Sequence, residues 1–303
     1  IGAHIDKILD LELVDITKIK DKKLKIIIDP VNSTGGIAVP LLLEKLGVEV
    51  VQINGELSGV FAHNPEPLPK NIRQICKEIK NGKFDLGIVV DPDVDRLALV
   101  DENGEPFGEE YTLVAVSDYV LSKTPGNTVS NLSSTKALKL VTEKRNGNHY
   151  PAAVGEVNVV AKMKEVAAVI GGEGNGGIIY PELHYGRDAL VGIALFLSSL
   201  AQFNRSASML RSQYPNYFIS KNKIELESGI NIEVILEKLK RKYAKHPIST
   251  IDGLKIDLDD DWIHLRKSNT EPIIRILEES KNLVTAYNLE NKIISDIKEI
   301  ITD

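Results

Sequence analysis

The chain has 303 residues, of which 43% are hydrophobic and 26% charged, the composition of an ordinary folded domain protein. With 43 acidic and 37 basic residues the formal net charge is −6, which argues against a dedicated nucleic-acid-binding protein or a protein of anionic membranes. The single cysteine, Cys76, excludes an internal disulfide, and no apolar run approaches 18 residues, so we expect a cytoplasmic protein.

The first third of the chain alternates between strand and helix patterns. Its apolar runs suit strands buried on both faces, and the isoleucines from Ile72 to Ile79 repeat at helical spacing. In chain order we expect a strand over 24–29, a helix ending near Gly47, a strand over 48–53, a helix over 72–81 and a strand over 84–90. This order predicts an α/β domain with a parallel sheet.

Two further blocks follow. The second is again α/β, and its segment over 188–200 is apolar nearly all round, which predicts a buried helix. The third predicts a strand, a helix over 230–243, three strands and a helix over 287–301, an α+β arrangement with an antiparallel sheet. We place the three domains at 1–106, 107–213 and 214–303.

The sharpest motif is Asp91-Pro92-Asp93-Val94-Asp95-Arg96, directly after a predicted buried strand. The carboxyl ends of strands are where α/β proteins place ligands. Three carboxylates at alternating positions of an extended loop would turn toward one point and supply the oxygen ligands that Mg²⁺ requires. Arg96 beside them would offset their charge or hold a phosphate oxygen. A solvated acidic turn is the alternative.

A second motif is the glycine-rich stretch over 171–177, Gly-Gly-Glu-Gly-Asn-Gly-Gly. Its glycines let the backbone approach a ligand closely. In an extended loop Glu173 and Asn175 would share one side, and a carboxylate with an amide suits sugar hydroxyls. A glycine-rich hairpin turn explains the same residues.

A third motif is Leu265-Arg266-Lys267-Ser268-Asn269-Thr270-Glu271-Pro272, with Arg275 just beyond. Cationic, hydroxyl and amide groups at this density favour phosphate binding. A polar turn between two strands is the alternative.

Together the three motifs resemble the signature loops of the α-D-phosphohexomutase family, which includes phosphoglucomutase, phosphomannomutase and phosphoglucosamine mutase. That family has four domains and carries, in order, a phosphoserine loop, a metal loop D-x-D-x-D-R, a sugar loop G-E-x-x-G and a phosphate loop R-x-S-[NG]-T-E-P. The last three occur here in the same order, and the resemblance spans essentially the whole chain. It implies the family's second, third and fourth domains, the fourth being α+β and similar to the TATA-box-binding protein.

The resemblance also implies roles for particular residues. Asp91, Asp93 and Asp95 would hold Mg²⁺, and Arg96 would lie beside the reacting phosphoryl group. Glu173 and Asn175 would contact the sugar hydroxyls. The phosphate that is not transferred would be held by Arg266, Ser268, Asn269, Thr270 and Arg275. Weaker local similarity adds Ser134, Lys136 and Glu156.

The nucleophile is the departure from the family pattern. The chain contains His63-Asn64-Pro65, but Ala62 stands where the phosphoserine loop has its serine. We interpret this stretch as a proline-rich loop of the second domain, so we expect the N-terminal serine domain to be absent from this chain.

In the family, phosphoserine phosphorylates a hexose phosphate, the bisphosphorylated sugar turns around, and the opposite phosphate returns to serine. We therefore expect an isomerase of hexose 1- and 6-phosphates, with a slight preference for glucosamine phosphate over mannose or glucose phosphate, and expect this chain to be inactive alone. The alternatives are a non-catalytic sugar-phosphate-binding protein and a phosphatase with an aspartate nucleophile at Asp91 or Asp93.

Overall fold

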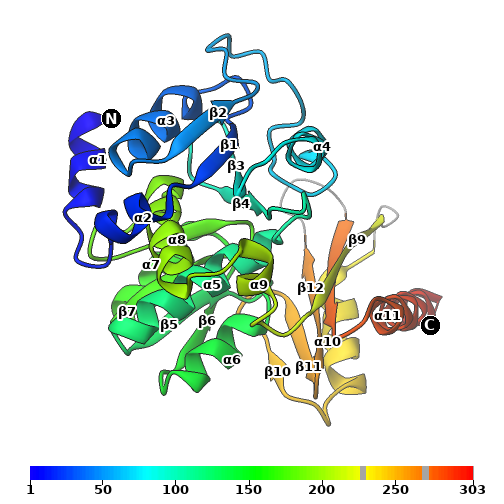
Figure 1. Ribbon diagram of the computed structural model, residues 1–303. Helices are drawn as coiled ribbons and strands as arrows, with labels where there is room; N and C mark the ends of the chain where they lie inside the picture. Colours follow the sequence, from blue (N-terminus) through cyan, green and yellow to red (C-terminus); the bar gives the residue numbers. More distant parts are fainter. Residues whose placement is uncertain (226–229, 268–272, 303) are drawn as a thin grey trace. The chain divides into compact units, whose positions relative to one another are not determined.

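The computed structural model describes residues 1–225, 230–267 and 273–302 (Figure 1). The chain divides into two compact units. The first consists of Ile1–Pro151 and Gly155–Tyr214, and the second of Ala152–Val154 and Pro215–Asp303.

The first sheet of the first unit has the strand order β2-β1-β3-β4. Strand β1 is parallel to β2 and β3, and β4 is antiparallel to β3. Its elements are α1 (Gly2–Leu9), α2 (Ile16–Lys22), β1 (Lys25–Asp29), α3 (Gly35–Lys45), β2 (Glu49–Gln52), α4 (Arg73–Asn81), β3 (Leu86–Val90) and β4 (Leu97–Val100).

The predicted alternation of strands and helices is confirmed from β1 to β3, because each element buries the apolar face that the spacing marked. Ile75 and Ile79 of α4 pack with Ile27 of β1 and Val89 of β3. The residues next to Ile27 and Val89 in these strands point to the opposite face of the sheet. Helices α1 and α2 were not predicted. They are short, and each places only one or two residues in the core.

The second sheet has the order β6-β5-β7-β8, with β5 parallel to β7 and β7 antiparallel to β8. Its elements are α5 (Glu109–Lys123), β5 (Asn127–Asn131), α6 (Ala137–Lys144), β6 (His149–Ala152), α7 (Glu156–Glu165), β7 (Ala168–Glu173), β8 (Gly177–Ile179), α8 (Ala189–Phe203) and α9 (Ala207–Arg211).

Helix α8 is the buried helix that the sequence predicted. All its residues from Ala189 to Ala201 are buried, and Asp188 caps its first turn by accepting hydrogen bonds from the N–H groups of Leu190 and Val191. Gly192 lies against the side chains of Leu97 in β4 and Ile178 in β8. The helix therefore packs against both sheets of the first unit and fixes β4 beside β8.

The second unit is an antiparallel sheet with the order β10-β11-β12-β13-β9. One face packs on two helices through a core that includes Leu239, Ile256, Ile276 and Ile297. Its elements are β9 (Phe218–Glu225), α10 (Ile232–Lys242), β10 (Ile248–Ser249), β11 (Leu254–Leu258), β12 (Asp261–Lys267), β13 (Ile273–Ser280) and α11 (Leu283–Thr302).

The predicted α+β class is confirmed, with two differences of detail. Four strands rather than three follow α10, because β10 has only two residues and carries no detectable periodicity. Helix α11 begins at Leu283 rather than at 287. The apolar residues Leu283 and Val284 of its first turn are exposed, so they do not mark a buried helix face in the sequence.

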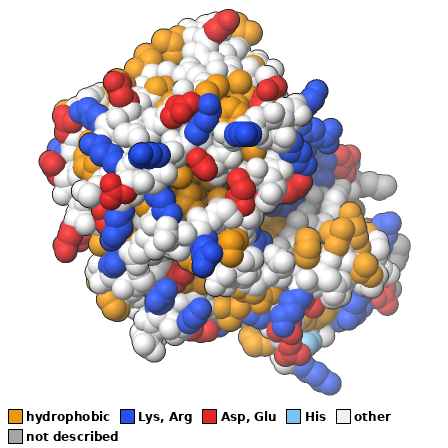
Figure 2. Space-filling view, in the orientation of Figure 1, with side chains coloured by type: hydrophobic (Ala, Val, Ile, Leu, Met, Phe, Trp, Pro, Cys, Tyr) orange, Lys and Arg blue, Asp and Glu red, His pale blue; other side chains and the backbone are white. Residues whose placement is uncertain are grey.

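The face shown in Figure 2 carries acidic and basic side chains interspersed with apolar ones, in keeping with the small net charge. Among the described residues, no helix has the length and apolar character needed to cross a bilayer.

Candidate active site

The three aspartates of the first motif occupy the turn between β3 and β4. One carboxylate oxygen from each of the three lies within 4.8 Å of the others. The segment is a tight turn and not the extended loop we expected: Val94 has φ 61°, and its N–H donates to the Asp91 carbonyl at 3.1 Å. A left-handed conformation is rare for a β-branched residue, and such strain gathers at functional sites.

Asp91 is the buried anchor of this turn, with 1% of its surface exposed. Its Oδ1 accepts from the N–H groups of Asp95 and Arg96, both at 3.0 Å, and its Oδ2 accepts from Arg96 Nε at 2.6 Å. Burial by itself raises the pKa of Asp91, but these hydrogen bonds and the charge of Arg96 outweigh it and hold the pKa below its usual value. Asp91 is therefore a fixed carboxylate.

The pKa of Asp95 is shifted in the opposite direction from that of Asp91. Burial, followed by the hydrogen bond to Asp91 and the negative charge of Asp91, raises the pKa of Asp95. Within the described residues its Oδ1 is buried and has no hydrogen-bond partner. A buried carboxylate oxygen that lacks a hydrogen bond and faces two further carboxylates fits a divalent cation such as Mg²⁺, whose charge would relieve the repulsion.

The glycine-rich motif forms the hairpin between β7 and β8. Glu173 ends β7 and is 4% exposed, whereas Asn175 lies in the turn and accepts from the Gly177 N–H at 3.2 Å. Gly176 has φ 89°, and a Cβ there would overlap the Leu97 carbonyl oxygen. Glycine is therefore required at this position.

The backbone joins this hairpin to the aspartate turn. Arg96 and Gly177 form an antiparallel β-bridge, and the Leu97 N–H donates to the Gly176 carbonyl at 3.0 Å. The first two motifs, although distant in the sequence, thus belong to one site.

Arg187 completes this site and was not predicted from the sequence. It lies in the loop before α8, where its Nη1 is 2.8 Å from Glu173 Oε2 and its Nη2 donates to Asp95. Burial by itself lowers the pKa of Arg187, but the charges of Asp95 and Glu173 outweigh it and raise the pKa. One guanidinium therefore links the aspartate turn to the glycine-rich hairpin.

Three polar residues surround the hairpin. Asn131 Nδ2 donates to Glu173 Oε1 at 2.8 Å, and the Gly174 N–H donates to Ser134 Oγ at 2.9 Å. Glu156 Oε1 accepts from the Arg187 N–H at 2.8 Å. Two of the weaker candidates, Ser134 and Glu156, thus contact the hairpin or its arginine, whereas Lys136 lies at the start of α6.

The loop that contains His63-Asn64-Pro65 is attached to the first sheet. His63 Nε2 lies 3.0 Å from Oδ2 of Asp29, a fully buried residue at the end of β1. His63 Nδ1 lies 2.8 Å from the Asn64 carbonyl. These contacts suit a loop that fixes the path of the chain.

The phosphate motif belongs to the second unit. Arg266 pairs directly with Arg275 across β12 and β13, and Arg275 pairs with Lys223 across β13 and β9. Directly paired residues share one face of a sheet, so three cationic side chains form a row. Arg266 Nε lies 2.8 Å from Asp252 Oδ2. Ser268, Asn269 and Thr270 lie outside the described residues.

A groove of about 500 Å³ lies over part of this row. It is lined by Lys221, Asn222, Lys223, Ile273, Arg275 and Leu277. Because the core residues Ile274 and Ile276 point to the opposite face, the groove lies on the face of the sheet away from α10 and α11. Its three cationic side chains suit an anion such as a phosphate.

Comparison with known families identifies two of the chain's domains. Residues 3–104 match the phosphoglucomutase/phosphomannomutase alpha/beta/alpha domain II, and residues 108–217 match domain III. The chain belongs to the phosphoglucomutase/phosphomannomutase family.

Two relatives within the family carry different substrate names. A phosphoglucosamine/phosphogalactosamine mutase of Sulfurisphaera tokodaii is 35% identical over 99% of this chain and 66% of its own length. A phosphoglucomutase/phosphomannomutase of Thermococcus kodakarensis is 35% identical over 89% of this chain and 59% of its own length. The chain thus spans about two thirds or less of these relatives.

Solved structures of the family have the same fold. A phosphoglucomutase/phosphomannomutase family protein of Burkholderia thailandensis superposes with a TM-score of 0.81 and 25% identity, over 94% of this chain and 63% of its own. An N-acetylphosphoglucosamine mutase of Aspergillus fumigatus, in complex with GlcNAc-6P and magnesium, gives a TM-score of 0.65 at 13% identity, over 97% and 68% of the two chains.

Proposed function

We propose that this chain forms the metal-, sugar- and phosphate-binding part of a phosphohexomutase, which interconverts hexose 1-phosphates and hexose 6-phosphates. The observation that carries the proposal is the link from Asp95 through Arg187 to Glu173, which joins the metal motif and the sugar motif in one site. Family membership supports the same reaction class.

Asp91, Asp93 and Asp95 would hold Mg²⁺, which when bound supplies positive charge to the oxygens of a transferring phosphoryl group. Arg96 is held against Asp91 and is 24% exposed, so part of its guanidinium faces solvent beside the aspartates. It would neutralise the same phosphoryl group, since preorganised cations are the main means of stabilising charge in phosphoryl transfer.

Glu173 and Asn175 would bind the sugar hydroxyls. Glu173 already accepts from Asn131, Gly155 and Arg187. A carboxylate offers about four acceptor positions, which leaves room for about one hydroxyl donor. The Asn175 amide, in the turn of the hairpin, would supply a donor as well.

The phosphate at the other end of the sugar would bind the cationic row of Arg266, Arg275 and Lys223. A phosphohexomutase must hold either phosphate of the bisphosphorylated intermediate while the other reacts. A separate phosphate site is therefore part of the reaction, and Ser268, Asn269 and Thr270 would complete it. We infer glucosamine phosphate as the preferred substrate, ahead of mannose or glucose phosphate, in line with the name of the Sulfurisphaera relative.

A phosphatase with Asp91 as nucleophile is disfavoured by the hydrogen bonds of Asp91. Both of its oxygens accept hydrogen bonds, from two backbone N–H groups and from Arg96. These bonds stabilise the carboxylate and hold it in place, which reduces its reactivity toward phosphorus.

The test is ³¹P NMR of this chain with Mg²⁺ and, in turn, glucosamine 6-phosphate, mannose 1-phosphate and glucose 1-phosphate, each seeded with a sugar bisphosphate. We expect shifted or broadened phosphate signals without interconversion, because the phosphoserine loop is not among these 303 residues. If this chain alone interconverted the sugar phosphates, the nucleophile would lie among its 303 residues, and this expectation would be wrong.

The matched variants are Arg275→Ala and Lys240→Ala. Each removes one positive charge from the second unit, but Lys240 lies on α10, on the helix side of the sheet. We expect Arg275→Ala to weaken binding by about tenfold or more, as for a charge-assisted hydrogen bond of roughly 1.5–3 kcal/mol, and Lys240→Ala to leave it unchanged. Equal effects would indicate a non-specific charge interaction.

A further inference from the structure

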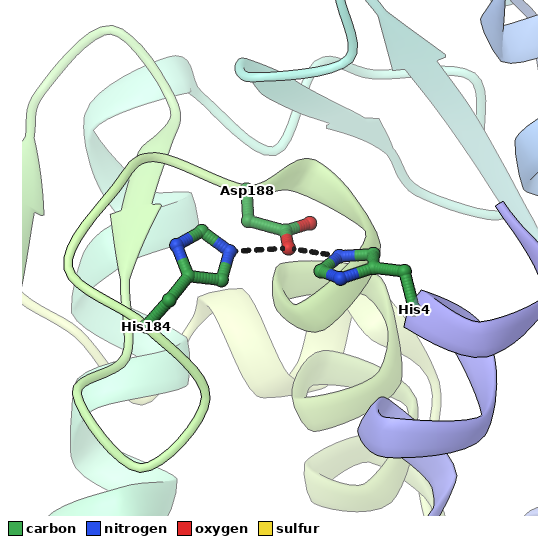
Figure 3. A group of neighbouring side chains, drawn as sticks. All are labelled: His4, His184 and Asp188. Carbon is green, nitrogen blue, oxygen red and sulfur yellow. Dashed lines mark hydrogen bonds and ion pairs between the residues drawn. The ribbon is translucent and has the colours of Figure 1, made fainter.

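Outside the active site, two histidines converge on one buried carboxylate. His4 Nε2 lies 2.6 Å and His184 Nε2 3.0 Å from the same oxygen, Oδ2 of Asp188 (Figure 3). His4 comes from α1, His184 from the loop after β8, and Asp188 from the N-cap of α8. Segments distant in the sequence therefore present three potential metal ligands to one point.

Asp188 is held in a fixed orientation. It is 6% exposed, and its Oδ1 accepts from the N–H groups of Leu190 and Val191 at 2.8 and 3.2 Å. Its Oδ2 is thereby directed toward the histidines. The His4 and His184 side chains are 36% and 41% exposed, so solvent reaches the cluster from the imidazole side.

We propose that His4, His184 and Asp188 bind a transition metal ion of the Zn²⁺ class. One ligand atom from each residue lies within 4.8 Å of the others. Bonds of about 2.0–2.2 Å in a tetrahedral site place ligand atoms about 3.3 Å apart. The two nitrogen–oxygen distances would need to lengthen by about 0.3–0.7 Å, a movement open to half-exposed imidazoles.

The ligand atoms of this site favour a different metal ion from those of the aspartate turn. Two imidazoles and one carboxylate favour Zn²⁺ and its neighbours in the transition series, whereas three carboxylates favour Mg²⁺. Three protein ligands leave a fourth position for water. A bound ion would also tie α1 to the start of α8, next to Arg187.

The test is calorimetric titration of the chain, prepared without a polyhistidine tag, with Zn²⁺ in excess Mg²⁺, which would occupy the aspartate turn. We expect one Zn²⁺ per chain. His4→Ala and His184→Ala should each weaken binding by more than about tenfold, since even residues that only support metal ligands contribute about 10–100-fold. His246→Ala, a half-buried histidine of the second unit, is the control.

Asp188→Asn tests the carboxylate while keeping a good helix cap, because asparagine also accepts hydrogen bonds from the first turn. It should weaken Zn²⁺ binding without loss of fold by circular dichroism. Co²⁺ provides a second measurement: its visible absorption should appear in the parent chain and in His246→Ala but not in His184→Ala. Zn²⁺ binding that is absent, or unchanged in both histidine variants, would show that the cluster is only hydrogen-bonded and overturn the proposal.

Discussion

Arg187 joins the two motifs of the site. Its guanidinium contacts Asp95 and Glu173, and its Nε lies 3.6 Å from Glu156 Oε2. It thus lies among carboxylates that would otherwise repel one another in a half-buried setting. No motif marks it, since a lone arginine in a loop is an ordinary surface residue until the fold places acidic groups around it.

We predict that Arg187→Met lowers the free energy of unfolding by roughly 2–3 kcal/mol. This is at or just below the lower end of the range for breaking a buried ion pair, because the guanidinium is 20% exposed. Saturating Mg²⁺ should reduce this loss, because the ion would neutralise Asp95 in place of the guanidinium. Urea unfolding with and without Mg²⁺ measures both effects. Arg145→Met, which removes a more exposed pair with Asp118, should cost about 1 kcal/mol or less and be insensitive to Mg²⁺. Equal losses of unfolding free energy in the two variants would show that Arg187 contributes no more than an exposed ion pair.

Glu278 gives the second unit a defined pH dependence. It is fully buried, its carboxylate has no hydrogen-bond partner among the described residues, and burial followed by the charge of Glu290 raises its pKa to about 8. Between pH 4.5 and 8 the unfolded chain releases a proton that the folded chain retains. The parent therefore loses stability as the pH rises through this window.

We predict that Glu278→Gln removes this loss. Its stability relative to the parent should increase from pH 4.5 upward and level off above pH 8, with a gain on the order of a few kcal/mol. Fluorescence of Trp262, the single tryptophan and a residue of the same unit, follows the unfolding. Glu237→Gln, on the exposed face of α10, is the control. A parallel pH profile for parent and variant would contradict the prediction.

At the scale of elements, the β7–β8 hairpin depends on a close backbone approach. Gly176 has positive φ and lies against the Leu97 carbonyl, next to the bridge that joins the two motifs. Gly59 also has positive φ, but a Cβ there would meet nothing within 4 Å. Alanine at Gly59 would therefore meet only the cost of a left-handed backbone, whereas alanine at Gly176 would also overlap a neighbouring atom.

We predict that Gly59→Ala costs about 1 kcal/mol, the penalty of a left-handed conformation, and Gly176→Ala about 2–4 kcal/mol, because the overlap with Leu97 adds to it. Chemical unfolding measures both. Similar losses in the two variants would show that the hairpin accommodates a side chain at Gly176.

At the scale of the whole molecule, each unit has a hydrophobic cluster of its own among the described residues. The core of the second unit contains Leu239, Ile256 and Ile276, whereas α4 and the first sheet form another cluster around Ile27 and Ile75. Units that bury separate apolar surfaces need not unfold together.

We predict two calorimetric transitions for this chain. Ile276→Ala should lower the temperature of one transition, and Ile88→Ala, at a buried position of β3, that of the other. Each substitution leaves a core cavity that costs about 2–5 kcal/mol. Trp262 fluorescence identifies the transition of the second unit. A single transition that both variants shift equally would show that the units unfold as one.

The sequence by itself determined the class of each block and the three motifs. Apolar periodicity marks the buried face of a strand or helix, so β1, α4, β3 and α8 were predicted from local spacing. The motifs were visible because their residues are adjacent in the chain. The two-residue strand β10 is too short to show a periodicity, and the first turn of α11 has exposed apolar residues, so neither was predicted.

Only the tertiary structure decided which distant residues meet. Arg187 reaches Asp95 across 92 positions of sequence, and His4 reaches Asp188 across 184. The contact of Arg187 with Asp95 depends on how α8 packs against β4 and β8 and on the backbone bridge from Arg96 to Gly177. The contact of His4 with Asp188 depends on how α1 packs against α8. Local sequence patterns indicate which face of a segment is buried, but they do not indicate which segments pack beside it. The partners of a charged side chain are therefore known only from the tertiary structure.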